Sequence, residues 1–172
     1  EASKVIDYES IIAKYCDGNA ELQSVLLTHS RQVADRALAI LAEHPEWVES
    51  GEVDPVFVEE AAMLHDLGIF LTDAPRIHCF GKSQYLCHGY LGAELLRSLG
   101  YERHARVCER HTGTGLHKEQ IIASGWDIPA RDFLPETLEE QLICFADKFY
   151  SKTKYLHTAR TFDQVVESMA KI

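Results

Sequence analysis

The apolar residues of this chain recur every three or four positions over most of its length. Leu22, Leu26, Val33, Ala37 and Ile40 are the clearest example, and this is the spacing at which one face of an α-helix is buried. No segment alternates apolar and polar residues as a half-exposed strand does, and no internal repeat is present. We therefore predict an all-α helical bundle, with helices at about 4–16, 20–43, 55–67, 85–99, 102–112, 117–124, 136–153 and 161–171.

Residues that begin and end helices support several of these boundaries. Asp54 followed by Pro55 is typical of a helix N-terminus, and Gly100 after Leu99 is typical of a helix end. The segment 161–164 has the sequence of a capping box.

Six histidine and aspartate residues interrupt the apolar stripes. The run 61–68 is apolar except for the adjacent pair His65 and Asp66, and an unpartnered carboxylate in such a position is costly. A lone histidine of this kind is more often a hydrogen-bonded core residue, and a lone aspartate more often joins an ion pair between helices. Six together favour a metal site in the core. The residues are His29, His65, Asp66, His88, His111 and Asp147.

The order of these residues carries a family resemblance. A histidine, a His-Asp doublet, two single histidines and an aspartate, all on helices, resemble the HD-domain metal-dependent phosphohydrolases. The doublet with its following Gly68 is similar to that family's signature, and the resemblance spans about residues 20–155. The segments 88–93 and 110–115 most resemble the small single-domain branch that includes bacterial dinucleoside tetraphosphate hydrolases.

The resemblance implies two divalent metal ions. One would be held by His29, His65, Asp66 and Asp147. Asp66 would bridge to a second ion, held also by His88 and His111, and the two oxygens of a carboxylate permit such a bridge. Nitrogen and oxygen ligands without thiolate suit Fe, Mn, Co or Zn, and we expect Fe first because dinuclear members often use it.

The expected activity is hydrolysis of a phosphoester or phosphoanhydride bond in a small, nucleotide-like substrate. A metal-activated hydroxide would attack phosphorus, with Asp66 as the catalytic residue that orients it. We expect Arg110, Lys118, Lys148 and Arg131 to bind substrate phosphates, and Lys152 is a further cation near Asp147. The long connections at 70–84, which contains Arg76, and at 125–135 are predicted walls of the substrate site.

Two other functions remain open at this point. Some HD-fold proteins with the same ligand set are mixed-valence di-iron oxygenases of a small polyol or phosphonate, and a noncatalytic nucleotide-binding module is the third possibility. Two family features are absent. No lysine follows Gly68, and Thr112 follows His111 where the cyclic-dinucleotide phosphodiesterases carry a second histidine, so we do not expect hydrolysis of cyclic di-GMP.

Composition narrows the partners. The 172 residues are enough for a single domain over 1–172, and the net charge of -10 argues against a nucleic-acid polymer or an anionic membrane as partner. The five cysteines are an odd number without Cys-x-x-Cys spacing, and no signal-like segment is present, so we expect a reducing cytoplasm. The oligomeric state is left open.

Overall fold

The structure is a bundle of α-helices with a two-stranded sheet at one edge, which confirms the predicted all-α class. The computed structural model describes residues 5–153 and 158–170. Its α-helices are α1 (Tyr8–Tyr15), α2 (Ala20–Ala42), α3 (Pro45–Glu49), α4 (Pro55–Leu64), α5 (His88–Ser98), α6 (Glu102–Glu109), α7 (Lys118–Ser124), α8 (Leu138–Asp147) and α9 (Phe162–Ala170). Within the described ranges, no helix is both long and apolar enough to cross a membrane.

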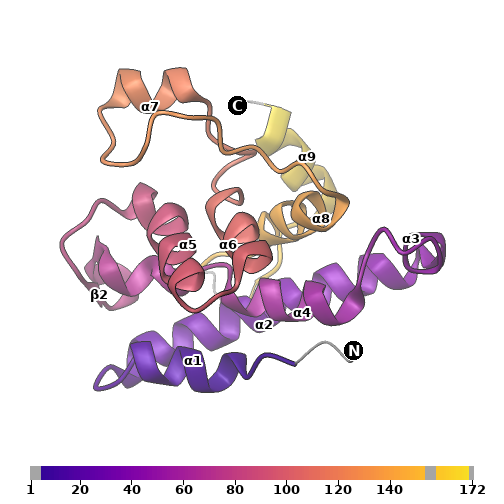
Figure 1. Ribbon diagram of the computed structural model, residues 1–172, viewed down its shortest axis with the longest axis horizontal. Coiled ribbons are helices and arrows are strands. Elements are labelled where there is room, and N and C mark those ends of the chain that lie inside the picture. The colour runs from indigo at the N-terminus through magenta and orange to yellow at the C-terminus, as the bar shows by residue number, and fades with distance from the viewer. Residues whose placement is uncertain (1–4, 154–157, 171–172) are drawn as a thin grey trace.

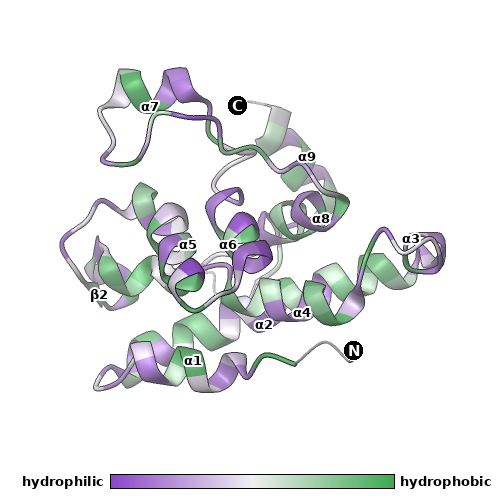
Figure 2. Ribbon diagram, in the orientation of Figure 1, coloured by the Kyte–Doolittle hydropathy of each residue, from purple (hydrophilic) through white to green (hydrophobic). Residues whose placement is uncertain are grey.

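Helix α4 lies at the centre of the bundle. It packs along the long helix α2 and also contacts α1, α6 and α8 (Figure 1). Its residues are mostly hydrophobic (green in Figure 2), and Phe57, Val58, Ala61, Met63 and Leu64 are all buried. Helices α5 and α6 pair with each other, whereas α7 stands apart from them in Figure 1. The buried core therefore surrounds the end of α4, where His65 and Asp66 follow.

The connection predicted at 70–84 is more ordered than expected. It contains the antiparallel strands β1 (Asp73–Ala74) and β2 (Cys79–Phe80), and the short 3₁₀ turn η2 (Pro75–Ile77) joins them. Two further 3₁₀ turns, η1 (Leu67–Leu71) and η3 (Tyr85–Cys87), flank this hairpin. Strands of two residues are too short to show an alternating pattern, so periodicity could not predict them.

Several helices are shorter than predicted, because apolar spacing does not distinguish an α-helix from the tighter turns that follow it. The predicted helix at 136–153 ends at Asp147, and the amides of Phe149 and Tyr150 bond to carbonyls only three residues earlier. The N-terminal helix begins at Tyr8, where the Asp7 side chain accepts a hydrogen bond from the Ser10 amide. The short helix α3 was not predicted.

The predicted caps are confirmed. The Asp54 side chain accepts a hydrogen bond from the Val56 amide at the start of α4. The amide of Gln164 donates to the Thr161 hydroxyl and the Thr161 amide to the Gln164 side chain. Gly100 has a positive φ of 88° after α5, a conformation that favours glycine at helix ends.

Two glycines bring the site-bearing segments together. A Cβ atom on Gly68 would lie 2.2 Å from the carbonyl oxygen of His88 and 2.5 Å from the amide nitrogen of Gly92, so η1 packs directly on the backbone of α5. A Cβ atom on Gly89 would lie 2.8 Å from the carbonyl oxygen of Cys108 in α6. These backbone contacts place Asp66, His88 and the end of α6 beside one another.

We predict that Gly68→Ala lowers the free energy of unfolding by about 3 kcal/mol, the upper end of the usual overpacking cost, because backbone atoms cannot move aside as a side chain can. Gly100→Ala is the matched control. Its Cβ would meet nothing within 4 Å, so it loses only about 1 kcal/mol through its positive φ. Urea unfolding measures both, and equal losses would contradict the close packing.

Candidate metal centre

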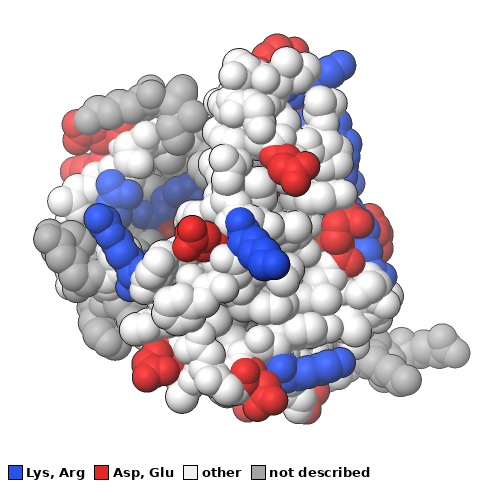
Figure 3. Space-filling model, turned by 90° about the vertical axis from the view of Figure 1, so that its left-hand side faces the viewer, with Lys and Arg blue, Asp and Glu red and all other residues white. Residues whose placement is uncertain are grey.

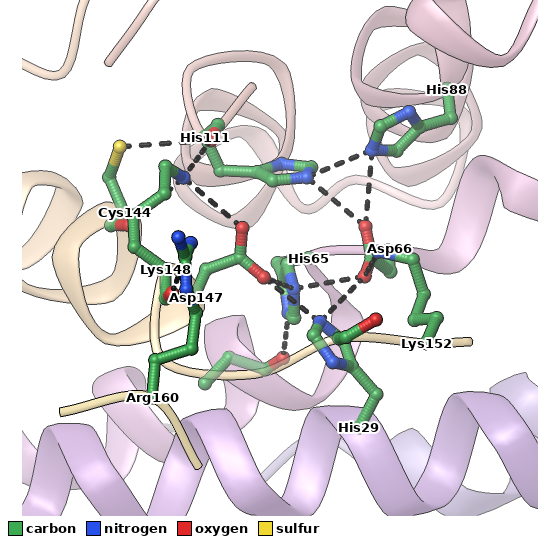
Figure 4. Close-up of polar contacts among 12 residues, drawn as sticks. His29, His65, Asp66, His88, His111, Cys144, Asp147, Lys148, Lys152 and Arg160 are labelled. Carbon is green, nitrogen blue, oxygen red and sulfur yellow. Dashed lines mark hydrogen bonds and ion pairs between the residues drawn. The ribbon is translucent and has the colours of Figure 1, made fainter. Parts of the chain in front are cut away.

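The six residues singled out in the sequence meet in one cluster (Figure 4). They come from the middle of α2 (His29), the end of α4 (His65 and Asp66), the first residue of α5 (His88), the segment after α6 (His111) and the last residue of α8 (Asp147). All are buried except Asp147, which is half-buried. Because the cluster lies beyond the end of α4, both members of the doublet reach it although they are adjacent in sequence.

His29, His65, Asp66 and Asp147 form one group of possible ligands. His29 Nε2 lies 2.9 Å from Asp147 Oδ1 and 3.2 Å from Asp66 Oδ2. His65 Nε2 lies 3.2 Å from Asp147 Oδ1 and 3.1 Å from Asp66 Oδ2. Two imidazole nitrogens and two carboxylate oxygens therefore face one another within 4.8 Å, a spacing that permits a shared metal ion.

A second group forms on the other side of the Asp66 carboxylate. Asp66 Oδ1 lies 3.2 Å from His88 Nε2 and 3.1 Å from His111 Nε2. The two histidine nitrogens are themselves 3.0 Å apart. Asp66 thus presents Oδ2 to the first group and Oδ1 to the second, which is the arrangement of a bridging carboxylate.

Backbone contacts fix the orientation of three of the rings. The Nδ1 atoms of His65, His88 and His111 donate to carbonyl oxygens three residues earlier, at 2.5, 2.6 and 2.6 Å respectively. A carbonyl oxygen only accepts hydrogen bonds, so Nδ1 carries the hydrogen, and the Nε2 of the neutral ring is a lone pair. In their neutral form all three rings therefore direct lone pairs into the cluster, as metal-binding histidines do.

The donor set fits a metal ion better than it fits hydrogen bonding alone. Neutral His88 and His111 rings cannot donate to each other or to Asp66 through Nε2. Among the described residues, Asp66 Oδ1 and His29 Nδ1 are buried side-chain atoms without a hydrogen-bond partner. Lone pairs that face one another in a buried site repel unless a cation lies between them.

Two lysines supply positive charge at the carboxylates. Lys152 Nζ lies 2.8 Å from Asp66 Oδ2. Lys148 Nζ lies 3.2 Å from Asp147 Oδ2 and also donates to the carbonyl oxygen of His111 at 2.9 Å. Lys148 thus connects the end of α8 to the segment that carries His111.

The protonation equilibria reflect this crowding. Burial by itself would raise the pKa of Asp66, but His65 and Lys152 hold it well below the usual carboxyl range. Burial opposes the charged form of His65, yet the carboxylates of Asp66 and Asp147 raise its pKa to about 10. Burial lowers the pKa of His111 to about 4. The same buried cluster therefore shifts the pKa values of His65 and His111 in opposite directions.

A cavity of about 930 Å³ adjoins the cluster. Tyr85, Asp147 and Lys152 line it beside the possible ligands, and Arg76 and Arg160 line it further along the chain. On the face shown in Figure 3 the surface is hollowed, and blue Lys and Arg side chains gather in the hollow. The predicted wall at 70–84 therefore contributes to the site through Arg76.

None of the four expected substrate-binding residues lines this cavity, although Lys148 contacts Asp147, which does. Arg110 is buried and donates to the carbonyl oxygen of Leu134 at 2.6 Å. Arg131 pairs with Glu109 at 3.3 Å, and Lys118 is exposed at the start of α7. Neither they nor any residue of 125–135 lines the cavity. Sequence proximity to His111 misled here, because the Arg110 side chain turns toward the segment before α8.

Two lysines and one arginine lie near the cluster or line the cavity beside it. Lys148, an expected substrate-binding residue, contacts the Asp147 carboxylate, and Lys152 was foreseen only as a nearby cation. Arg160 was missed, since no pattern links the segment before α9 to the site.

The five cysteines are buried and free, and none belongs to the possible ligand groups among the described residues. A third group, His117, Glu119 and Asp132, is fully exposed.

Comparisons with known proteins agree with this geometry. The chain is similar to an uncharacterized protein of Methanocaldococcus jannaschii, MJ0778, with 36% identity over 70% of this chain and 62% of that protein. It is also similar to proteins named tRNA (cytidine(56)-2'-O)-methyltransferase from Picrophilus torridus, with 30% identity over 64% of this chain, and Thermoplasma volcanium, with 27% identity over 80%. It spans only 29% and 35% of those two proteins. No solved structure matches the chain. The HD domain family matches residues 26–151, and the chain therefore belongs to the HD-domain metal-dependent phosphohydrolase superfamily.

Proposed function

We propose that this chain is a metal-dependent phosphohydrolase that acts on a small, nucleotide-like phosphorylated compound and uses two divalent ions. The observation that carries the proposal is the division of one buried cluster into two groups of possible ligands that share Asp66. The cavity beside the cluster supports a small substrate, because its volume of about 930 Å³ is that of a ligand pocket.

The proposed ligands follow from the contacts of each group. His29, His65, Asp66 and Asp147 hold one ion, and Asp66, His88 and His111 hold the other. Nitrogen and oxygen donors favour Fe, Mn, Co or Zn over Mg or Ca, and iron is the first choice. When bound, such ions polarise a phosphoryl group and lower the pKa of water.

The protein's own residues orient the reacting groups. Asp66 is held between His65 and Lys152 by contacts of 3.1 and 2.8 Å, so its two oxygens keep fixed directions. Lys148 orients Asp147 and the backbone of His111. Lys152, whose ammonium group pairs with Asp66, also lines the cavity, so its positive charge can attract a phosphoryl oxygen. Burial of the histidines removes water that would weaken these charges.

Two alternatives give different results in one screen. Two relatives are named as methyltransferases, but this chain matches only about a third of each. Their names therefore do not support methyltransferase activity for this chain. A di-iron oxygenase of a polyol or phosphonate needs the same six donors. We therefore screen protein purified under low oxygen with Fe, Mn, Co and Zn for phosphate release from nucleotides and dinucleoside polyphosphates. Oxygen consumption with a polyol or phosphonate, without phosphate release from any compound, would favour the oxygenase.

We predict that metal removal destabilises the wild-type protein more than the His88→Gln variant, which keeps only the ion site of His29, His65, Asp66 and Asp147. An ion bound only to the native state stabilises it by mass action, so chelation should lower the melting temperature of the wild type by several degrees. A glutamine amide can donate to Asp66 Oδ1, which relieves the repulsion in the metal-free site. Calorimetric scans with and without chelator compare the two proteins. The same metal-dependent rise in both would contradict a role for His88 as ligand.

Asp66→Ala should reduce the phosphate-release rate at saturating substrate by at least about a hundredfold, because it removes the group shared by both ion sites. Asp35→Ala is the control, since Asp35 is an exposed residue of α2 that pairs only with Arg31. Steady-state kinetics with the best substrate of the screen gives both rates. A folded Asp66→Ala protein with near-normal turnover would refute the mechanism.

A further inference from the structure

Two arginines in the wall of the cavity have no carboxylate partner in the described parts of the chain. Arg76 lies in η2 between the two strands, and it makes no hydrogen bond or ion pair with a described residue. Arg160 precedes α9, and its side-chain contact is a long bond of 3.5 Å to the carbonyl oxygen of Lys148. Both side chains line the cavity that adjoins the metal centre.

This is unusual in a protein with 27 acidic and 17 basic residues. Most other arginines are paired with carboxylates, namely Arg31, Arg97, Arg103, Arg106, Arg110 and Arg131. Arg36 instead lies over the rings of Phe149 and Tyr150. In the described part of the chain, the two guanidinium groups without a carboxylate or aromatic partner therefore both line the cavity beside the cluster.

The carboxylates of the cluster have lysine partners and do not depend on these arginines for charge balance. Lys152 already pairs with Asp66, and Lys148 already pairs with Asp147. Any bound divalent ion adds further positive charge for the reacting phosphoryl group. The carboxylate of Glu167 also lines the cavity but has an interaction of its own. Two guanidinium groups are thus left for an anion other than the one at the metals.

The positions of the two arginines fit such an anion. Figure 4 shows the Arg160 side chain reaching toward Asp147 and Lys148, whereas Arg76 belongs to the hairpin connection on a different element. A group held between them would lie in the cavity beside the reacting phosphoryl group. The planar fork of a guanidinium group matches phosphate oxygens better than an ammonium group does.

We propose that Arg76 and Arg160 bind a second phosphate group, so that the substrate is a small molecule with two separate phosphates, one at the metal centre and one in this arginine pair. The inference rests on the phosphohydrolase function proposed above and names its substrate class. Arg76 and Arg160 are the residues that determine this specificity.

Equilibrium binding to the full chain tests the inference without catalysis. Isothermal titration calorimetry with metal-loaded protein compares the non-hydrolysable phosphonate analogues of adenosine 3′,5′-bisphosphate and adenosine 5′-monophosphate. The wild type should bind the bisphosphate at least about tenfold more tightly, the effect of one charge-assisted contact. Arg76→Gln and Arg160→Gln should each lose about that preference, and Arg76→Lys should restore part of it. Lys14→Gln removes a positive charge from α1, outside the cavity, and should leave the preference unchanged.

Parallel assays separate this inference from the proposed function. Equal binding of the two compounds, or a preference that both arginine variants retain, would overturn the inference even if the metal-loaded protein releases phosphate. A preference that depends on the arginines, together with no phosphate release from any compound, would support the anion site while the proposed hydrolysis fails. Because Arg76 and Arg160 are exposed, the variants should fold, and their melting temperatures verify this.

Discussion

The Nδ1 hydrogens of His65, His88 and His111 bind carbonyl oxygens three residues earlier, and the rest of the site depends on these contacts. When the rings are neutral, as metal binding requires, these contacts leave three Nε2 lone pairs that converge on Asp66, a carboxylate that is itself fully buried. Such a set of acceptors is unfavourable in a protein interior without a cation. The stability of the fold and the chemistry of the site are therefore linked through the same atoms.

The helical bundle holds this arrangement by ending its helices at the cluster. Helices α4 and α8 end at the cluster, and α5 begins there. Side chains of different helices therefore meet in the space between helix ends. The contacts of Gly68 and Gly89 bring backbone against backbone where a Cβ would not fit. Lys148 and Lys152 then balance the carboxylates on the cavity side. Positions of this kind are set by tertiary packing and not by local helix propensity.

The difference between buried polar residues and surface charges explains what the sequence could predict. His29 and the doublet His65 and Asp66 stand out because each is polar in an apolar pattern, and periodicity therefore identified the residues that the fold brings together. The charged residues of the cavity wall could not be identified in this way. The sequence does not show whether a surface arginine faces solvent, a carboxylate or a cavity. Arg110 is adjacent to His111 in the sequence, but its side chain donates to the carbonyl oxygen of Leu134. Arg160 lies in the segment before α9, and it contacts the carbonyl oxygen of Lys148. Kinship with the dinucleoside tetraphosphate hydrolases stays a prediction.

The central claim is that the converging atoms bind metal ions in two groups that share Asp66. Anomalous diffraction from a crystal of protein purified under low oxygen tests it most directly, because it locates each metal independently of the protein atoms. The account predicts two peaks, one among His29, His65 and Asp147 and one beside His88 and His111, with Asp66 between them. A well-ordered crystal of the native protein with no peak in the cluster, or with a single peak in only one of the two groups, would contradict binding in two groups.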